Sequence, residues 1–350
     1  MKKNLTCLLL LILSFMFLFH PDKSFAKQES TNLIGGLSYE VLYPENQGNK
    51  NLGYFDLTMQ PGQEQIVSLK LYNSLSQELT VQIRLSTAKT NSIGKVEYGP
   101  SDLKEEDSLI NDFTEIVKGP TKVTIPAKGS KQVDLVISLP KDSFNGLIAG
   151  GIQLKPLRDD VTDDQKKKDI VVNEFAFLVG MLLRIGDTNN IKPELKLNQT
   201  YIAFKDGKSH LFVNISNIRP VFVEGMSVAI QVRKNNKQKD LFEYQGKDLR
   251  MAPNSIIDLP IDLADKGITA GMYTAQINVS TKTGGHWSWT EDFKVNKLEA
   301  DNLNKQSTEN KTDSKGLFWA VFFILCIGLL VFSLAYMAIK RKRLSKNKYS

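Results

Sequence analysis

The chain has 350 residues, and its 45 Lys and Arg outnumber its 38 Asp and Glu, which gives a formal charge of +7 and a pI near 9.1. The excess is concentrated in residues 1–26 and 340–350, and the segment between them carries about −1. We therefore expect no nucleic-acid partner, because nucleic-acid-binding proteins carry their basic patch on a folded surface.

The first 26 residues have the pattern of a secretory signal peptide. Two lysines precede an apolar run over residues 8–19, and residues 24–26 resemble a cleavage site with small residues at both ends. The run is too short to span a membrane. We expect residues 1–26 to be removed, which leaves a short extension at 27–32.

Cys7 and Cys326 are the only cysteines, so residues 27–315 contain none. Exported animal domains of this size usually carry disulfides, and their absence suits the exterior of a Gram-positive bacterium. Each domain must then be held by its own apolar core, and this length is sufficient for two domains.

Short strands dominate the chain from residue 36 to residue 297. Apolar residues alternate with polar ones, and Gly, Pro, Asn and Asp separate the runs, with no long helical period between them. The clearest alternation occurs at 66–71, 80–85, 133–137, 211–215, 228–232 and 273–279. This pattern predicts an all-β protein built from immunoglobulin-like β-sandwiches.

The same order of features occurs twice. Each half has a strand that ends in Asn, a second strand, a Pro-containing turn, a third strand, and a Gly before a fourth strand. The markers are Asn73, Pro126 and Gly146 in the first half and Asn217, Pro253 and Gly271 in the second. We predict two tandem sandwiches of related design, at 33–186 and 187–297.

Two segments of the first half need separate explanations. The insertion at 91–118 has no counterpart in the second half; it either carries binding residues or packs against its surroundings. The charged stretch at 158–169 predicts an exposed loop. The run at 170–185 is too apolar for a linker, and we expect a long strand that pairs back on residues 151–154.

The C-terminal part predicts a membrane anchor. Residues 298–315 are polar, lack aromatic side chains and predict a flexible stalk. Residues 317–339 carry no charge and are long enough to cross a bilayer, and basic residues follow at once. We expect a transmembrane helix at 316–339, a cytoplasmic tail at 340–350, and a folded part that faces the cell wall.

The sequence predicts no enzyme. Residues 138–141, 143–145 and 282–284 match short motifs of penicillin-binding enzymes, but Ser138 ends a predicted strand and the third motif falls in a hairpin turn of the other half. His210 and His286 are the only histidines between the two ends, so no His/Cys zinc set can form. We expect no catalytic residue, no metal site and no cofactor.

Six residues are candidate ligand contacts: Asn46, Gln47, Thr90, Asn91, Trp287 and Trp289. The four polar residues lie near strand ends and turns, where they either bind a glycan or peptide or satisfy local backbone groups. The two tryptophans share one face of a strand because they are two residues apart, so they either stack on sugar rings or close a core.

Taken together, these stretches resemble the family of WxL-interacting proteins, which are surface proteins of Gram-positive bacteria. The resemblance runs from about residue 33 to the C-terminus. The matching stretches are 43–47, 54–57, 61–63, 88–91, 144–146 and 150–152 in the first half, and 175–180, 193–197, 251–255, 271–273, Trp287 and Phe293 in the second.

The resemblance implies a non-catalytic cell-surface scaffold or adhesion protein. It implies a peptidoglycan-binding domain followed by a host-binding domain, with peptidoglycan, WxL-domain surface proteins and host extracellular-matrix proteins as partners. The family division places the strand near residue 175 in the second domain, whereas the expected pairing places it in the first. The alternative is an assembly or export accessory that pairs with secreted partners by strand addition, for which the long 171–185 strand is the motive.

Overall fold

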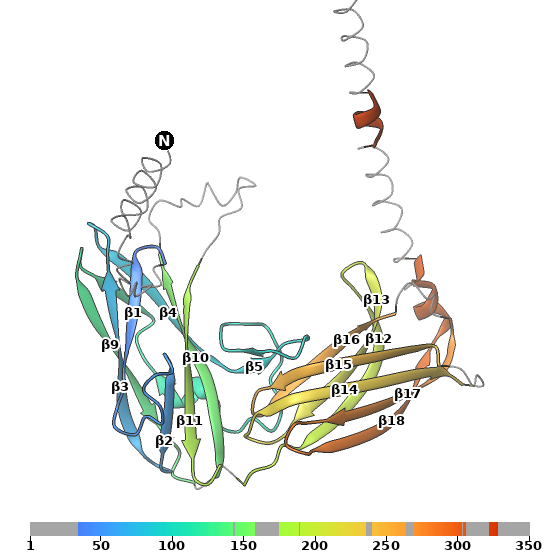
Figure 1. Cartoon of the computed structure of the whole chain (residues 1–350), viewed down its shortest axis with the longest axis horizontal. Coiled ribbons are helices and arrows are strands. Elements are labelled where there is room, and N and C mark those ends of the chain that lie inside the picture. The colour runs from blue at the N-terminus through green and yellow to red at the C-terminus, as the bar shows by residue number, and fades with distance from the viewer. Residues whose placement is uncertain are drawn as a thin grey trace, which may run out of the picture.

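The computed structural model describes residues 34–142, 144–157, 175–188, 190–235, 240–263, 269–302, 304–305 and 322–327. The described strands form two β-sandwiches that stand side by side and are joined after β11 (Phe177–Ile185) (Figure 1). The first stands upright in that view, and the second lies across it. The predicted all-β class is confirmed.

The first sandwich packs a sheet with the strand order β1-β3-β9-β7 against a sheet with the order β2-β11-β10-β4-β8. The bounds are β1 (Leu37–Leu42), β3 (Glu64–Asn73), β9 (Ser130–Ser138), β7 (Val117–Lys118), β2 (Phe55–Met59), β10 (Gly146–Pro156), β4 (Leu79–Thr87) and β8 (Lys122–Ile125). In β9, Val133, Leu135 and Ile137 are buried while their neighbours are exposed. Burial of each such side chain stabilises the fold by about 1.5–3 kcal/mol.

The predicted pairing of the 170–185 run is confirmed for the part that is described. β11 lies antiparallel to β10, with Gly180 opposite Gly151 and Phe177 opposite Leu154. On its other side, β11 pairs in parallel with β2. β2 pairs with Met181–Ile185, so this half of β11 has a neighbour on both edges and offers no free edge for strand addition. The charged stretch and residues 170–174 lie outside the described residues.

The second sandwich is antiparallel throughout its described strands and packs a β12-β13-β16 sheet against a β15-β14-β17-β18 sheet. The bounds are β12 (Leu195–Lys205), β13 (Lys208–Asn217), β16 (Ser255–Asp262), β15 (Phe242–Met251), β14 (Val223–Lys234), β17 (Gly271–Ser280) and β18 (His286–Val295). Tyr273 is buried in its core and stacks on Phe293 with the ring centroids 5.4 Å apart.

The predicted internal repeat has a matching hydrogen-bond motif in each sandwich. At the end of β3, the Asn73 amide donates to the carbonyl four residues on (2.8 Å) and to that of Pro126 (3.0 Å). At the end of β13, the Asn217 amide donates to the carbonyl four residues on (2.7 Å) and to that of Ala252 (2.9 Å). Each asparagine ties its strand to the Pro-containing turn, and we call this motif the asparagine clamp.

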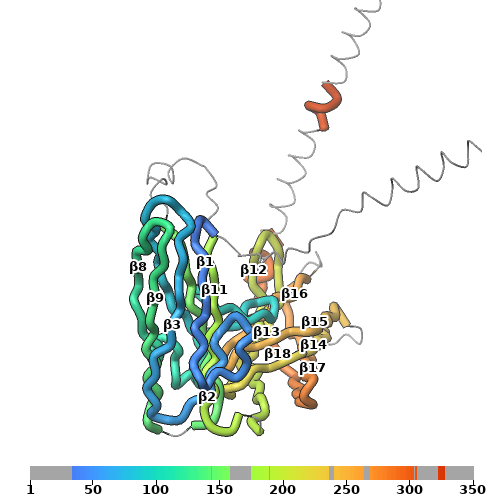
Figure 2. Tube along the Cα trace, turned by 60° about the vertical axis from the view of Figure 1, so that its left-hand side comes forward, coloured from blue at the N-terminus to red at the C-terminus, as the bar shows by residue number. Residues whose placement is uncertain are grey.

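The insertion at 91–118 begins between the two sandwiches, next to β5 (Lys89–Thr90) (Figure 1), and ends as β7 in a sheet of the first sandwich; Figure 2 shows the same chain turned by 60°. It follows β5, which pairs with β6 (Val96–Glu97), and it contains the single turn α2 (Phe113–Ile116). Phe113 is fully buried in the first core, and Gly150 gives its ring room, because a Cβ there would lie 2.2 Å from the ring. This part of the insertion is therefore packing.

The terminal predictions fall largely on residues that the structure does not describe. The expected signal peptide, the 27–32 extension and the 340–350 tail lie outside the described residues, and the expected stalk is described only at 298–302 and 304–305. Of the expected span at 316–339, only residues 322–327 are described, and they are helical. Among the described residues, no helix has both the length and the apolar character needed to cross a membrane.

Candidate functional site: a cleft between the two sandwiches

The two sandwiches are hydrogen-bonded to each other through Thr90 at the end of β5. The Ala252 N–H donates to Thr90 Oγ1 (2.9 Å), and Thr90 Oγ1 lies 2.6 Å from Ser255 Oγ. The Ser255 hydroxyl in turn donates to the Ala252 carbonyl (2.8 Å). Thr90 is 3% exposed, so this predicted ligand contact is occupied by the second sandwich.

Further contacts surround this hydrogen-bonded centre. Gly94 adopts a φ of +69°, and its carbonyl accepts from the Arg250 N–H (2.8 Å). A Cβ at Gly94 would lie 2.7 Å from that of Leu249, so glycine serves both the turn and the close approach. In the turn between β15 and β16, the Asn254 amide donates to the Ser108 carbonyl of the first sandwich (3.0 Å).

A small apolar cluster is shared by the two sandwiches. Ala88 and Ala149 come from the first, Ala252 comes from the second, and all three are buried. Four partly buried side chains pack on them: Val96, Tyr98, Leu182 and Phe222. Docking therefore buries apolar surface as well as forming hydrogen bonds, which favours one fixed arrangement of the two sandwiches.

A cleft of about 690 Å³ opens beside this shared cluster. Its first wall is the outer face of β11 with the loop before β2, and its second wall is the start of β14 with the end of β15. The lining residues are Leu52, Gly53, Tyr54, Tyr98, Leu147, Leu178, Gly180, Met181, Leu182, Arg184, Thr188, Ile191, Val221, Phe222, Glu224 and Arg250. The lining presents polar and apolar surface in nearly equal parts, and a concave site of this size that combines apolar side chains with polar groups is typical of ligand-binding sites.

Each wall carries one arginine that is paired within its own sandwich. On the first wall, Arg184 donates to Asp56 through Nε (2.6 Å) and Nη2 (3.3 Å). On the second, Arg250 donates to Glu224 through Nε (2.7 Å) and Nη2 (2.6 Å). The Arg250 guanidinium also lies over the Phe222 ring, 4.8 Å from its centroid. The charges in the cleft are thus neutralised by neighbours.

Tyr98 connects the shared cluster to the cleft. It follows β6 and crosses β10 at Gly151, where a Cβ would lie 2.2 Å from the Tyr98 carbonyl oxygen. Burial raises the pKa of the Tyr98 hydroxyl above its ordinary value, although the nearby Arg250 acts in the opposite direction. The bond with Glu224 raises the pKa of Arg250, so the guanidinium stays charged.

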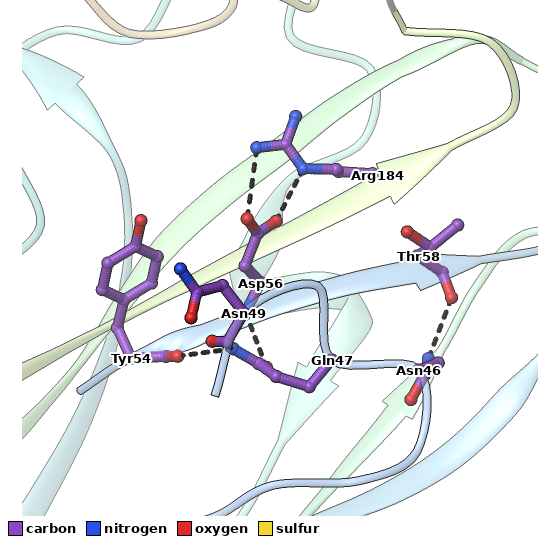
Figure 3. Close-up of polar contacts among 7 residues, drawn as sticks. All are labelled: Asn46, Gln47, Asn49, Tyr54, Asp56, Thr58 and Arg184. Atoms are coloured by element: carbon purple, nitrogen blue, oxygen red, sulfur yellow. Dashed lines mark hydrogen bonds and ion pairs between the residues drawn. The ribbon is translucent and has the colours of Figure 1, made fainter. Parts of the chain in front are cut away.

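Gln47 organises the loop that forms the rim of the first wall (Figure 3). Its side-chain amide donates to the carbonyls of Asn49 (2.9 Å) and Tyr54 (3.1 Å), and its Oε1 accepts from the Asp56 N–H (3.0 Å). Gln47 is 7% exposed. This predicted ligand contact therefore fixes the position of Tyr54 in the cleft.

Asn46 and Asn91 are also engaged in local hydrogen bonds. Asn46 donates to the Thr58 carbonyl (2.9 Å; Figure 3) and exchanges two amide hydrogen bonds with Gln65 (3.0 and 2.8 Å). Asn91 donates to Glu97 (2.8 Å) and accepts from the Lys95 N–H (2.9 Å), which closes the β5–β6 turn. Their contact with a ligand stays a prediction.

Trp287 and Trp289 lie on β18 and are not among the residues that line the cleft. Both are partly buried and pack against the core of the second sandwich. Trp287 also borders a hollow of about 550 Å³, together with the polar Asn278 and Ser288. A role in sugar binding stays a prediction for both. Among the described residues, no three His, Cys, Asp or Glu side chains come close enough to share a metal ion.

The cleft residues were missed by the sequence reasoning, although one signal was present. The outward positions of β11 are Leu178, Gly180, Leu182 and Arg184. Two leucines on an outer face indicate that something covers or occupies that face. The aromatic residues Tyr98 and Phe222 gave no such signal, because their meeting depends on how the two sandwiches dock.

Two family models match the chain. The peptidoglycan binding domain of WxL Interacting Protein matches residues 38–156, and the host binding domain of the same family matches residues 166–305. The order is the one that the sequence resemblance predicted. The second match begins before β11, although β11 pairs into the first sandwich. A search of the curated proteins finds no match.

Solved structures show only weak likeness. A structure titled "Chaperone-tip adhesin complex is vital for synergistic activation of CFA/I fimbriae biogenesis" has a TM-score of 0.28 and 12% identity, and the match covers 73% of this chain and 98% of that chain. The Escherichia coli chaperone DraB has a TM-score of 0.27 and 12% identity over 74% and 97%. The Pseudomonas aeruginosa CupB2 chaperone has 0.26 and 12% over 67% and 95%. At these scores the likeness carries no argument.

Proposed function

We propose that this chain, which belongs to the WxL-interacting protein family, is a non-catalytic scaffold of the cell surface that binds peptidoglycan through its first domain and a protein partner through its second. The partner is a WxL-domain surface protein or a host protein. The observation that supports this proposal most is the succession of the two family domains along one chain. Both are named for binding, and neither is named for catalysis.

The docking of the sandwiches supports a scaffold. Thr90, Gly94 and Ser108 of the first sandwich all bond the second, and the shared alanine cluster excludes water between them. A rigid two-domain body holds two partners at a fixed separation. A flexible linker would instead lower the effective concentration of one partner near the other.

We also propose that the chain is a single-pass protein of the cell membrane with its folded part toward the cell wall. The support comes from the uncharged residues 317–339 and the basic residues that follow them. Protease added to intact protoplasts should digest residues 34–305 and leave a protected C-terminal fragment. A chain that is digested only after the membrane is broken would contradict this orientation.

Binding is tested by sedimentation with insoluble peptidoglycan. The purified full chain should pellet with peptidoglycan and remain in solution when the wall is first digested to soluble fragments. A purified secreted protein with a WxL domain should enter the pellet only when the chain is present. If the chain binds neither the wall nor the protein, the proposed function is wrong.

A further inference from the structure

We propose that the cleft between the two sandwiches is the docking groove for an extended segment of the protein partner, which inserts bulky apolar side chains into it. The proposal rests on the proposed function, in that it assumes a protein partner. It adds where the partner binds and which chemistry the groove recognises.

The exposed apolar surface of the groove favours an apolar occupant. Leu178 is 46% exposed although it lies in the concave wall, and Leu52, Leu182 and Phe222 are only partly buried. Exposure of these apolar side chains to water is unfavourable in free energy. An apolar side chain inserted between the two walls would cover them and exclude that water.

The charges of the groove favour a protein segment over a glycan. A sugar needs polar groups directed at its hydroxyls, but Arg184 and Arg250 are already held by carboxylates of their own sandwiches. Arg250 binds Glu224 through Nε and Nη2, and its guanidinium lies over the Phe222 ring, so part of its polar edge is already bonded within the second sandwich and its charge is neutralised there. Aliphatic and aromatic side chains fit such a lining, whereas an anionic ligand would compete with Asp56 and Glu224.

The shape of the groove fits an extended segment. Its floor at Gly180 is low because this residue of β11 has no side chain, and the side chains of Tyr54 and Leu178 rise beside it. Side chains two residues apart point to the same side of an extended peptide, so two of them can enter together. The groove continues the contact between the sandwiches, since Tyr98, Leu182 and Phe222 belong both to its lining and to the shared cluster.

Because the walls come from different sandwiches, the groove exists only when they are docked. Tyr54, Gly180 and Arg184 belong to the first sandwich, and Phe222 and Arg250 belong to the second. The hydrogen bonds of Thr90 that hold the sandwiches together therefore also hold the groove open.

The probe for the test is a blocked heptapeptide, Gly-Ser-Phe-Ala-Leu-Ser-Gly, with fluorine on the phenylalanine ring. Fluorine NMR detects its binding to the full chain without background from the protein. Gly180→Leu should plug the groove without straining the fold, since a Cβ there meets Tyr54 only at an ordinary contact of 3.7 Å. Leu178→Glu should place a charge in the groove. Ile66→Glu is the matched control, because Ile66 is equally apolar and is 62% exposed on the opposite sheet.

We expect saturable binding by the wild-type chain, weakened about tenfold or more by Gly180→Leu and by Leu178→Glu and changed less than about twofold by Ile66→Glu. No saturable binding at about 1 mM, or equal binding by all four chains, would overturn the proposal. Displacement of the peptide by chitotetraose, with loss of chitotetraose binding in Gly180→Leu, would show a glycan site instead and would also overturn it.

The same variants separate this proposal from the proposed function. If the Gly180→Leu variant still pellets with peptidoglycan and with the protein partner, the groove is not the partner's binding site, and the proposed scaffold function still stands. If the wild-type chain binds the peptide in the groove but binds neither peptidoglycan nor a surface protein, the groove is a peptide-binding site and the proposed scaffold function is wrong.

Discussion

The asparagine clamp occurs at one end of each sandwich, but the two ends have opposite surroundings. In the first sandwich, the turn that Asn73 holds is exposed at Pro126, Ala127 and Lys128. In the second, the turn that Asn217 holds is buried, with Ala252 at 0% and Ser255 at 3% exposure. The local motif is the same, so the difference arises from what covers it.

The cover is the turn between β5 and β6. It reaches out of the first sandwich and places Thr90 and Gly94 on the clamp of the second. No counterpart leaves the second sandwich in its described residues, because β14 and β15 are joined without such an insertion. The added segment thus helps to join two related domains into one body, together with contacts from β10 and β11 such as the bond from the Leu147 N–H to the Pro220 carbonyl (2.7 Å). Of the four predictions that follow, two concern this contact between the sandwiches and two concern the cleft beside it.

The largest effect is expected from Ala252→Glu. Ala252 packs against Ala88 and Ala149, so the substitution would bury a carboxylate without a partner. Such a buried charge destabilises the docked arrangement by about 3–5 kcal/mol, so the two sandwiches should separate and expose the carboxylate to water. Small-angle scattering should show an extended chain, and heating should show two unfolding transitions. Ala127→Glu, in the exposed turn of the first sandwich, is the control and should leave both measurements unchanged.

Thr90→Val should give the next largest effect. It keeps the shape of the side chain but leaves the buried Ala252 N–H without its acceptor and removes the hydroxyl that contacts Ser255 Oγ. Loss of such a buried partner costs about 1–3 kcal/mol, measured as the free energy of unfolding in urea. Thr80→Val removes a hydroxyl from the exposed Thr80–Thr124 pair and should cost almost nothing. Equal costs would refute the role assigned to Thr90.

Gln47→Ala acts on the first wall of the cleft and leaves the contact between the sandwiches intact. It removes three hydrogen bonds that hold the loop before β2, but water can reach part of this loop. We expect a cost of about 1 kcal/mol, with faster hydrogen exchange confined to residues 48–56. Asn49→Ala removes one exposed hydrogen bond in the same loop and should have little effect. An equal rise in hydrogen exchange at β5 would show that the loop before β2 and the contact between the sandwiches are coupled, and would contradict this prediction.

The smallest effect concerns alkaline pH. Burial raises the pKa of Tyr98 in the folded chain above its unfolded value of about 10. The stability that comes from the neutral phenol is therefore present below about pH 10 and is lost as pH rises toward the folded pKa. Tyr98→Phe should flatten the decline of the urea midpoint between about pH 9 and pH 11. Tyr244→Phe removes a phenol whose pKa burial also raises, and it serves as the comparison within the second sandwich.

Much of the fold was predictable because it depends on local periodicity. Alternating apolar residues indicated β9 and β17, and the apolar run at 170–185 indicated a long strand that pairs back on residues 151–154. The candidate contacts were harder to interpret. Gln47 and Thr90 have the polar character of ligand contacts, but the backbone groups that occupy them are not visible in a linear pattern.

The sequence by itself determined the two β-sandwiches, their related order, and the family to which the chain belongs. These features follow from side-chain alternation, turn residues and their spacing, which act over a few residues at a time. Only the tertiary structure decided that Thr90 meets Ser255, which lies 165 residues away, and that Tyr98 and Phe222 share one cleft with Arg184 and Arg250. Such contacts depend on how two finished domains dock, and no local pattern carries that information.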